Sequence, residues 1–217
     1  MYFARALKLF YMPLIFQQQI NECTKIGVWH ITETEDFFAV PLSRDITNQH
    51  KRLQHLAGRY LLRRLFPEFP LNLVLIADTR KPFLANEAFH FSISHCGDFA
   101  AAIASTKHRV GADIEIPHPK VERVKHKFLS AAEQELLIKQ AGDTHQLLTM
   151  AWSIKEAVFK WEGAGQMDFI KHIEIIGLSK THEGLSAQCL FKKARQIALE
   201  VHSMMLGENN LSWLVTE

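Results

Sequence analysis

The sequence predicts an α+β protein of two similar, pseudo-symmetric halves, residues 1–108 and 109–217, with a ligand-binding crevice between them. Three observations lead to this prediction. A chain of 217 residues is long enough for one large domain or two small ones. Each half runs from a strand-like segment through helical segments into antiparallel strands. The two series meet near residues 107–112.

The first half is predicted to contain one long helix flanked by strands. Ser43 is predicted to cap this helix, which runs to about Phe66 and stops before two prolines. β-Branched residues or alternating polarity predict strands over residues 24–31, 71–77, 89–94 and 99–105. The turn sequence HCGD joins the last two, which therefore predict a hairpin.

The second half is predicted to follow the same order. Ser130 precedes Glu133 by three residues, which is the spacing of a capping box at the start of a helix. A further helix contains WSIKEAVFK, residues 152–160, and ends near Gly163 and Gly165. Strands are predicted over residues 109–116, 173–178, 185–191, 197–204 and 211–216.

The WSIKEAVFK helix has two chemically different sides at about 100° per residue. One side is apolar and predicts a buried face: Ile154, Ala157, Val158 and Trp161. The other side mixes aromatic rings with charges: Trp152, Lys155, Glu156, Phe159 and Lys160. A solvated face with an i,i+4 ion pair is one interpretation. A ligand-binding surface is the other.

Composition narrows the class of protein. The net charge of the chain is only +2, whereas nucleic-acid-binding proteins are usually strongly basic, so no nucleic-acid partner is expected. Three widely spaced cysteines argue against a disulfide framework or a zinc site and favour a reducing compartment. No run approaches the roughly 20 apolar residues that span a bilayer. We therefore expect a cytoplasmic protein without a membrane partner.

Two carboxylates occur at alternate positions of one predicted strand. Asp113 and Glu115 therefore project from the same face, which Gly111 keeps open. Like charges this close favour an intervening cation, and oxygen ligands suit Mg²⁺. Glu156 offers a third carboxylate. An exposed polar strand face is the alternative interpretation.

Basic residues occur where a phosphate ligand would need them. The first long helix carries a stripe at spacings of three and four residues: Arg52, His55, Arg59 and Arg63. Further candidates lie at predicted turns, namely Arg80, Lys81, Ser94 and His95. Such groups form charge-assisted hydrogen bonds to phosphate oxygens. A solvated basic face would show the same helical stripe.

Taken in order, these segments resemble the Sfp-like 4′-phosphopantetheinyl transferases. The resemblance covers about residues 12–170 and rests on FSISHCGDFAAAIA, VGADIE, KFLSAAEQE and WSIKEAVFK. They correspond to the family patterns I-S-H-S, G-x-D-x-E, F-x-x-x-E and W-x-x-K-E-(S/A)-x-x-K. The chain departs from the family at three places. Cys96 stands where serine is usual, and Arg80 stands where the pattern G-K-P has glycine. After the helix, GAGQ replaces the more typical G-K-G.

The resemblance implies the family's fold and a holo-[acyl-carrier-protein] synthase activity. Phosphopantetheine would pass from coenzyme A, as co-substrate, to a serine of an apo acyl or peptidyl carrier protein, releasing 3′,5′-ADP. Asp113, Glu115 and Glu156 would hold Mg²⁺. Family and size together imply a monomer.

The resemblance also implies individual roles. Lys160 would stabilise the leaving group, and Glu156, directly or through a metal-bound water, would act as base for the attacking serine. The coenzyme A contacts would come from Arg52, Arg59, Lys81, Ser94, His95, Asp113, Lys155 and Lys160. Trp152 is assigned to packing beside the site. Glu133 has two interpretations, a helix cap or an acidic site residue, and the capping spacing favours the first.

Two other functions use the same residues. Three carboxylates and nearby cations would also serve a Mg²⁺-dependent phosphohydrolase or nucleotidyltransferase. The basic stripe between Arg52 and Arg64 would serve an RNA-binding module, whose affinity would fall steeply with salt.

Overall fold

The computed structural model describes residues 13–42 and 45–217. The first part of the chain forms an antiparallel sheet of four strands in the order β1-β2-β6-β5. Its strands are β1 (Leu14–Asn21), β2 (Thr24–His30), β5 (His90–Cys96) and β6 (Phe99–Ser105). A short ribbon lies apart from this sheet and comprises β3 (Val74–Ile76) and β4 (Pro82–Leu84). The helical segments are α1 (Glu35–Phe38), α2 (Gln49–Leu65) and the 3₁₀ turn η1 (Leu71–Leu73).

The second part forms an antiparallel sheet of five strands in the order β7-β11-β10-β9-β8. Its strands are β7 (Arg109–Glu115), β8 (Ile173–Lys180), β9 (Leu185–Phe191), β10 (Ile197–Leu206) and β11 (Asn209–Thr216). The helical segments are α3 (Lys120–Val124), η2 (Lys125–Lys127), α4 (Ala131–Ile138), α5 (Thr144–Glu162) and α6 (Phe169–His172). No helix in the described part of the chain is long and apolar enough to cross a membrane.

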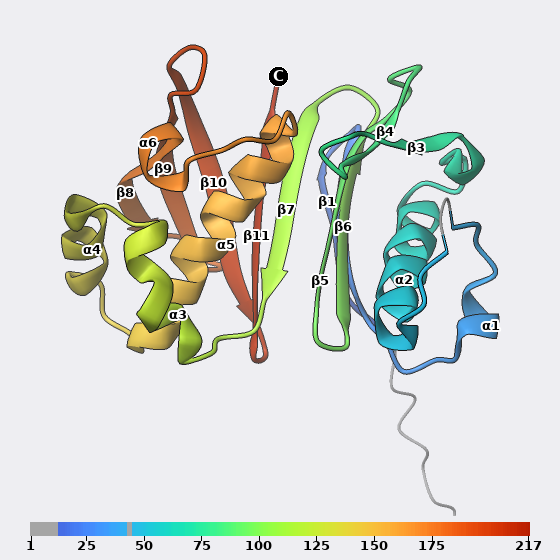
Figure 1. Ribbon diagram of the computed structural model, residues 1–217, viewed down its shortest axis with the longest axis horizontal. Coiled ribbons are helices and arrows are strands. Elements are labelled where there is room, and N and C mark those ends of the chain that lie inside the picture. The colour runs from blue at the N-terminus through green and yellow to red at the C-terminus, as the bar shows by residue number, and fades with distance from the viewer. Residues whose placement is uncertain (1–12, 43–44) are drawn as a thin grey trace, which may run out of the picture.

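Three apolar cores hold these layers together. The first joins α2 to one face of the four-stranded sheet, and the second joins α5 to the five-stranded sheet. The third lies between the two sheets, where Ile26 and Ile103 meet Ile114 and Trp213. Figure 1 shows α1 and α2 at one end of the long axis, α4 at the other, and both sheets between them. Burial of apolar area in the third core unites the two parts of the chain.

The predicted strands are largely confirmed. β2, β6, β7 and β11 are buried at most positions rather than at alternate ones, as expected of short apolar strands that are covered on both faces. The hairpin of β5 and β6 and the four strands after α6 lie where the sequence places them. Residues 71–77 instead begin as η1 and continue as the short β3. β1 was not predicted, because its sequence LIFQQQIN carries polar residues at half-buried as well as exposed positions.

The predicted start of the first long helix is wrong. Ser43 lies outside the described residues, and α2 begins at Gln49 with Asn48 as its N-cap. The Asn48 side chain accepts a hydrogen bond from Lys51 N at 2.9 Å, which satisfies one of the free N–H groups of the first turn. The predicted capping box of α4 is confirmed, since Ser130 and Glu133 exchange side-chain to backbone hydrogen bonds.

β7 and α5 approach so closely that only glycine fits at Gly111. A Cβ atom there would lie 2.2 Å from Ala157 O and 2.8 Å from Trp161 Cβ. This contact sets the distance between the strand that carries Asp113 and the helix that carries Glu156.

We expect Gly111→Ala to lower the free energy of unfolding by about 2–4 kcal/mol, because backbone atoms of α5 cannot yield locally. Urea unfolding followed by circular dichroism measures this change. Gly177→Ala is the matched control, since its Cβ would meet Gln188 at an ordinary 3.7 Å. Equal stabilities for the two variants would contradict the close approach.

Candidate active site

Asp113 lies at the centre of a polar cluster where β5, β7 and α5 meet. Its side chain is only 3% exposed. Asp113 Oδ1 accepts hydrogen bonds from Ser94 Oγ at 2.7 Å and from Lys160 Nζ at 2.5 Å. Lys160 Nζ also donates to Ser94 Oγ at 2.7 Å. Three residues that are distant in the sequence therefore form one cluster that joins the two sheets.

The second oxygen of Asp113 makes the cluster incomplete. Asp113 Oδ2 is buried and has no hydrogen-bond partner among the residues that the structure describes. A buried carboxylate oxygen without a donor or cation costs free energy, and native proteins rarely leave one in this state. The geometry therefore favours an added cation or donor at this atom.

Glu115 lies beside Asp113 on the same face of β7 and is held by an aromatic side chain. Trp152 Nε1 donates to Glu115 Oε1 at 3.2 Å, and the Trp152 ring packs between Phe128 and Phe169. Burial raises the pKa of Glu115, and the charge of Asp113 raises it further. Trp152 thus does more than pack, because it also orients a candidate ligand.

Glu156 projects from α5 into the same electrostatic environment. Burial raises the pKa of Glu156 to about 7, and the negative charge of Asp113 adds to this effect. Lys160 acts in the opposite direction but does not compensate. A carboxyl group that changes its protonation near neutral pH is suited to accept a proton in catalysis.

These carboxylates match the chemistry of a hard cation but are not arranged as finished ligands. Within residues 13–42 and 45–217, no three His, Cys, Asp or Glu side chains form a group able to hold a metal ion. The Lys160 ammonium takes the contact with Asp113 instead. The unpartnered Asp113 Oδ2 and the raised pKa values of its two neighbours fit an oxygen-liganded ion such as Mg²⁺.

The structure does not bring Lys155 to this cluster. Its side chain is fully buried, and Nζ contacts Glu133 Oε1 at 2.6 Å. The same ammonium donates to Ile173 O at 2.8 Å and Phe169 O at 2.9 Å. The expectation that Lys155 shares the site face of its helix is therefore corrected. Glu133, which caps α4, has the structural role that its spacing predicted.

Two adjoining cavities lie beside the Asp113 cluster and are lined by cations. The first, of about 180 Å³, includes Arg80, Lys81 and Lys160 among its lining residues. The second, of about 190 Å³, includes His55, Arg59, Arg80 and His95. No carboxylate among the described residues lines either cavity. Both cavities are therefore electrostatically suited to anionic groups.

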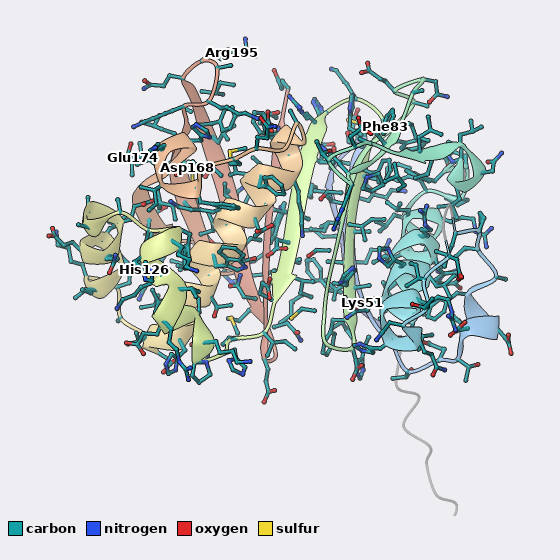
Figure 2. All side chains as sticks on the ribbon, viewed as in Figure 1. Lys51, Phe83, His126, Asp168, Glu174 and Arg195 are labelled. Atoms are coloured by element: carbon teal, nitrogen blue, oxygen red, sulfur yellow. The ribbon has the colours of Figure 1, made fainter. Side chains whose placement is uncertain are left out.

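Lys81 links the first cavity to the end of α5. Its Nζ donates to Trp161 O at 3.4 Å, and Thr79 Oγ1 donates to Gly163 O at 3.2 Å. Burial lowers the pKa of Lys81 to about 8, and the charge of Arg109 lowers it further. Figure 2 marks Phe83 on the β3–β4 ribbon, on the upper side of the view, where α5 also ends.

His95 and Arg59 line the second cavity, as a phosphate-binding role requires, whereas Arg52 does not line either cavity. The Arg52 guanidinium binds Glu35 with two hydrogen bonds of 2.7 Å. The rings of His55 and His95 lie 5.2 Å apart. Burial lowers the pKa of His95, and so does the charge of Lys160. The helical spacing of His55 and Arg59 was the signal for this cavity.

Comparison with known proteins covers the part of the chain that carries most of this site. Residues 109–212 match the model of the 4′-phosphopantetheinyl transferase superfamily, and this segment includes all three carboxylates and Lys160. The expected resemblance is therefore confirmed at the level of the superfamily.

Individual relatives show the same similarity. Enterobactin synthase component D of Salmonella typhi is 32% identical over 113 residues, which is 51% of this chain and 47% of the relative. The 4′-phosphopantetheinyl transferase psf-1 of Bacillus pumilus is 31% identical over 117 residues, 51% of this chain and 50% of the relative. The 4′-phosphopantetheinyl transferase AcpT of Salmonella typhimurium is 31% identical over 126 residues, 55% of this chain and 64% of the relative. The chain thus spans about half the length of the first two relatives and somewhat more of the third.

Proposed function

We propose that this chain is an Sfp-type 4′-phosphopantetheinyl transferase that modifies a serine of an apo acyl or peptidyl carrier protein. The observation that carries the proposal is the cluster of Ser94, Asp113 and Lys160, with Glu156 beside it and cationic cavities adjoining. The match of residues 109–212 to the superfamily supports it. In this proposal the two parts of the chain act as pseudo-symmetric halves, the site lies in the crevice between them, and one copy suffices.

The proposed reaction needs an anionic leaving group and a deprotonated nucleophile. The carrier serine oxygen attacks the phosphorus bonded to the pantetheine oxygen, and the bond from this phosphorus to the bridging oxygen breaks. The serine proton passes to Glu156, whose raised pKa suits an acceptor near neutral pH. The Lys160 ammonium would stabilise the negative charge of the departing 3′,5′-ADP.

Mg²⁺, held by Asp113, Glu115 and Glu156, would supply charge neutralisation at the pyrophosphate. Trp152 would keep Glu115 in place, and Ser94 would keep the Asp113 carboxylate facing Lys160. The cations of the two cavities would bind and orient the nucleotide.

Intact-mass analysis of an apo carrier protein, incubated with this chain, coenzyme A and Mg²⁺, tests the proposal. We expect the carrier to gain the mass of one phosphopantetheine, and we expect EDTA or a carrier without the serine to prevent this gain. Release of phosphate or pyrophosphate with an unchanged carrier would favour a phosphohydrolase or nucleotidyltransferase instead. A chain that neither binds coenzyme A nor modifies any of several carriers would refute the proposal.

A further inference from the structure

Arg80 has a backbone conformation that its residue type rarely adopts. It lies in the turn between β3 and β4 with φ of +68°. Its N–H donates to Ala77 O at 2.8 Å, and Ala77 N donates to Lys81 O at 2.9 Å, which closes the turn. Glycine suits this left-handed region, whereas a residue with a Cβ atom is strained there. A strained arginine in a tight turn suggests that its side chain has a function.

The position of the side chain indicates what this function is. Arg80 lines the cavity that contains Lys160 and also the cavity that contains His55, Arg59 and His95. Among the basic residues of the described part of the chain that line these two cavities, Arg80 is the one they share. Its guanidinium can therefore add positive charge at the point where one cavity passes into the other.

The two cavities suit the two phosphate groups of coenzyme A. The pyrophosphate on the ribose 5′ carbon must lie near the reacting groups, which places it by Lys160 in the first cavity. The phosphate monoester on the 3′ carbon then falls to the second cavity, whose polar lining, among the described residues, is His55, Arg59, Arg80 and His95. A planar guanidinium can bind such a phosphate through two parallel hydrogen bonds.

We propose that Arg80 is a specificity-determining residue that binds the 3′-phosphate of coenzyme A and makes the protein favour coenzyme A over 3′-dephospho-coenzyme A. This inference rests on the proposed function, because it takes coenzyme A as the ligand. It concerns a residue whose backbone the turn holds in a strained conformation.

Calorimetric titration of the whole protein with each of the two nucleotides, without a carrier, tests the inference. We expect the wild-type protein to bind coenzyme A more tightly than the dephospho form. Arg80→Gly should weaken coenzyme A binding roughly 10- to 100-fold, the range for loss of a charge-assisted hydrogen bond. Its affinity for the dephospho form should stay within about twofold, and Arg80→Lys should retain part of the preference.

Two controls separate binding from folding. Arg80→Gly should melt at the same temperature as the wild type or higher, because glycine removes the strain. Glu87→Gly relieves a similar strain, at φ of +52°, without removing a cation, so it should leave both affinities unchanged. If Arg80→Gly weakened the binding of both nucleotides equally, or of neither, the proposed role of Arg80 would be wrong. The proposed transfer function would not be affected by that result. Failure of the wild type to bind either nucleotide would overturn the proposed function as well.

Discussion

Glu156→Gln is expected to stabilise the folded protein above neutral pH while greatly slowing transfer. The pKa of Glu156 rises from 4.5 to about 7 on folding, so between these values the folded state holds a proton that the unfolded state releases. The free energy of unfolding therefore falls as pH rises through this window. Glutamine cannot ionise, so the variant should lack this loss and be more stable by about 2 kcal/mol at pH 8, after allowance for partial solvent screening.

Urea unfolding at pH 5 and pH 8 measures both parts of this stability prediction, in the absence of divalent cations. The wild type should lose more stability than Glu156→Gln between the two pH values. Glu208→Gln, an exposed site in the β10–β11 turn, is the control and should follow the wild type. If the free energy of unfolding depended on pH identically in the wild type and in Glu156→Gln, folding would not disfavour the ionised form of Glu156.

The same substitution should reduce transfer to the carrier by about 10³-fold or more, because it removes both a proton acceptor and a candidate ligand. Single-turnover rates with saturating coenzyme A and carrier measure this loss. A variant that keeps more than a tenth of the wild-type rate would exclude Glu156 as the base. A variant that is more stable but less active than the wild type is expected where a side chain serves catalysis at a cost in stability.

Lys155→Met is expected to destabilise the protein by about 3–5 kcal/mol, because it leaves the carboxylate of Glu133 buried without its cation. Ile173 O and Phe169 O would also lose their donor. Urea unfolding at pH 7 measures this loss. Lys155→Met combined with Glu133→Gln should recover part of it, since the uncompensated charge is then absent.

Lys160→Met is the matched comparison for Lys155→Met, because it removes the same type of side chain from the same helix, α5. We expect a smaller loss of stability but a large loss of coenzyme A affinity, since Lys160 Nζ faces Ser94 and the cavity. Folded Lys155→Met, assayed at low temperature, should bind coenzyme A as the wild type does. A larger loss of stability in Lys160→Met, together with a larger loss of coenzyme A affinity in Lys155→Met, would contradict the roles that we assign to the two lysines.

Much of the site could be predicted because its residues repeat at the periods of regular structure. Asp113 and Glu115 alternate on a strand, and Glu156 and Lys160 lie four positions apart on a helix, so each pair shares a face before any folding is considered. The sequence could not indicate that Ser94, from another sheet, would donate to Asp113. That contact depends on how the edges of the two sheets meet, which is set by the apolar core between them.

The sequence by itself determined the strands after α6, the β5–β6 hairpin, the cap of α4 and the apolar face of α5, because these depend on neighbours within a few residues. Only the tertiary structure showed which of the two lysines of α5 lies at the site. Lys155 and Lys160 look alike in the helical pattern, yet one ends in a buried ion pair and the other at the site. The partner of a polar side chain comes from distant parts of the chain, so its role is decided when the layers pack together.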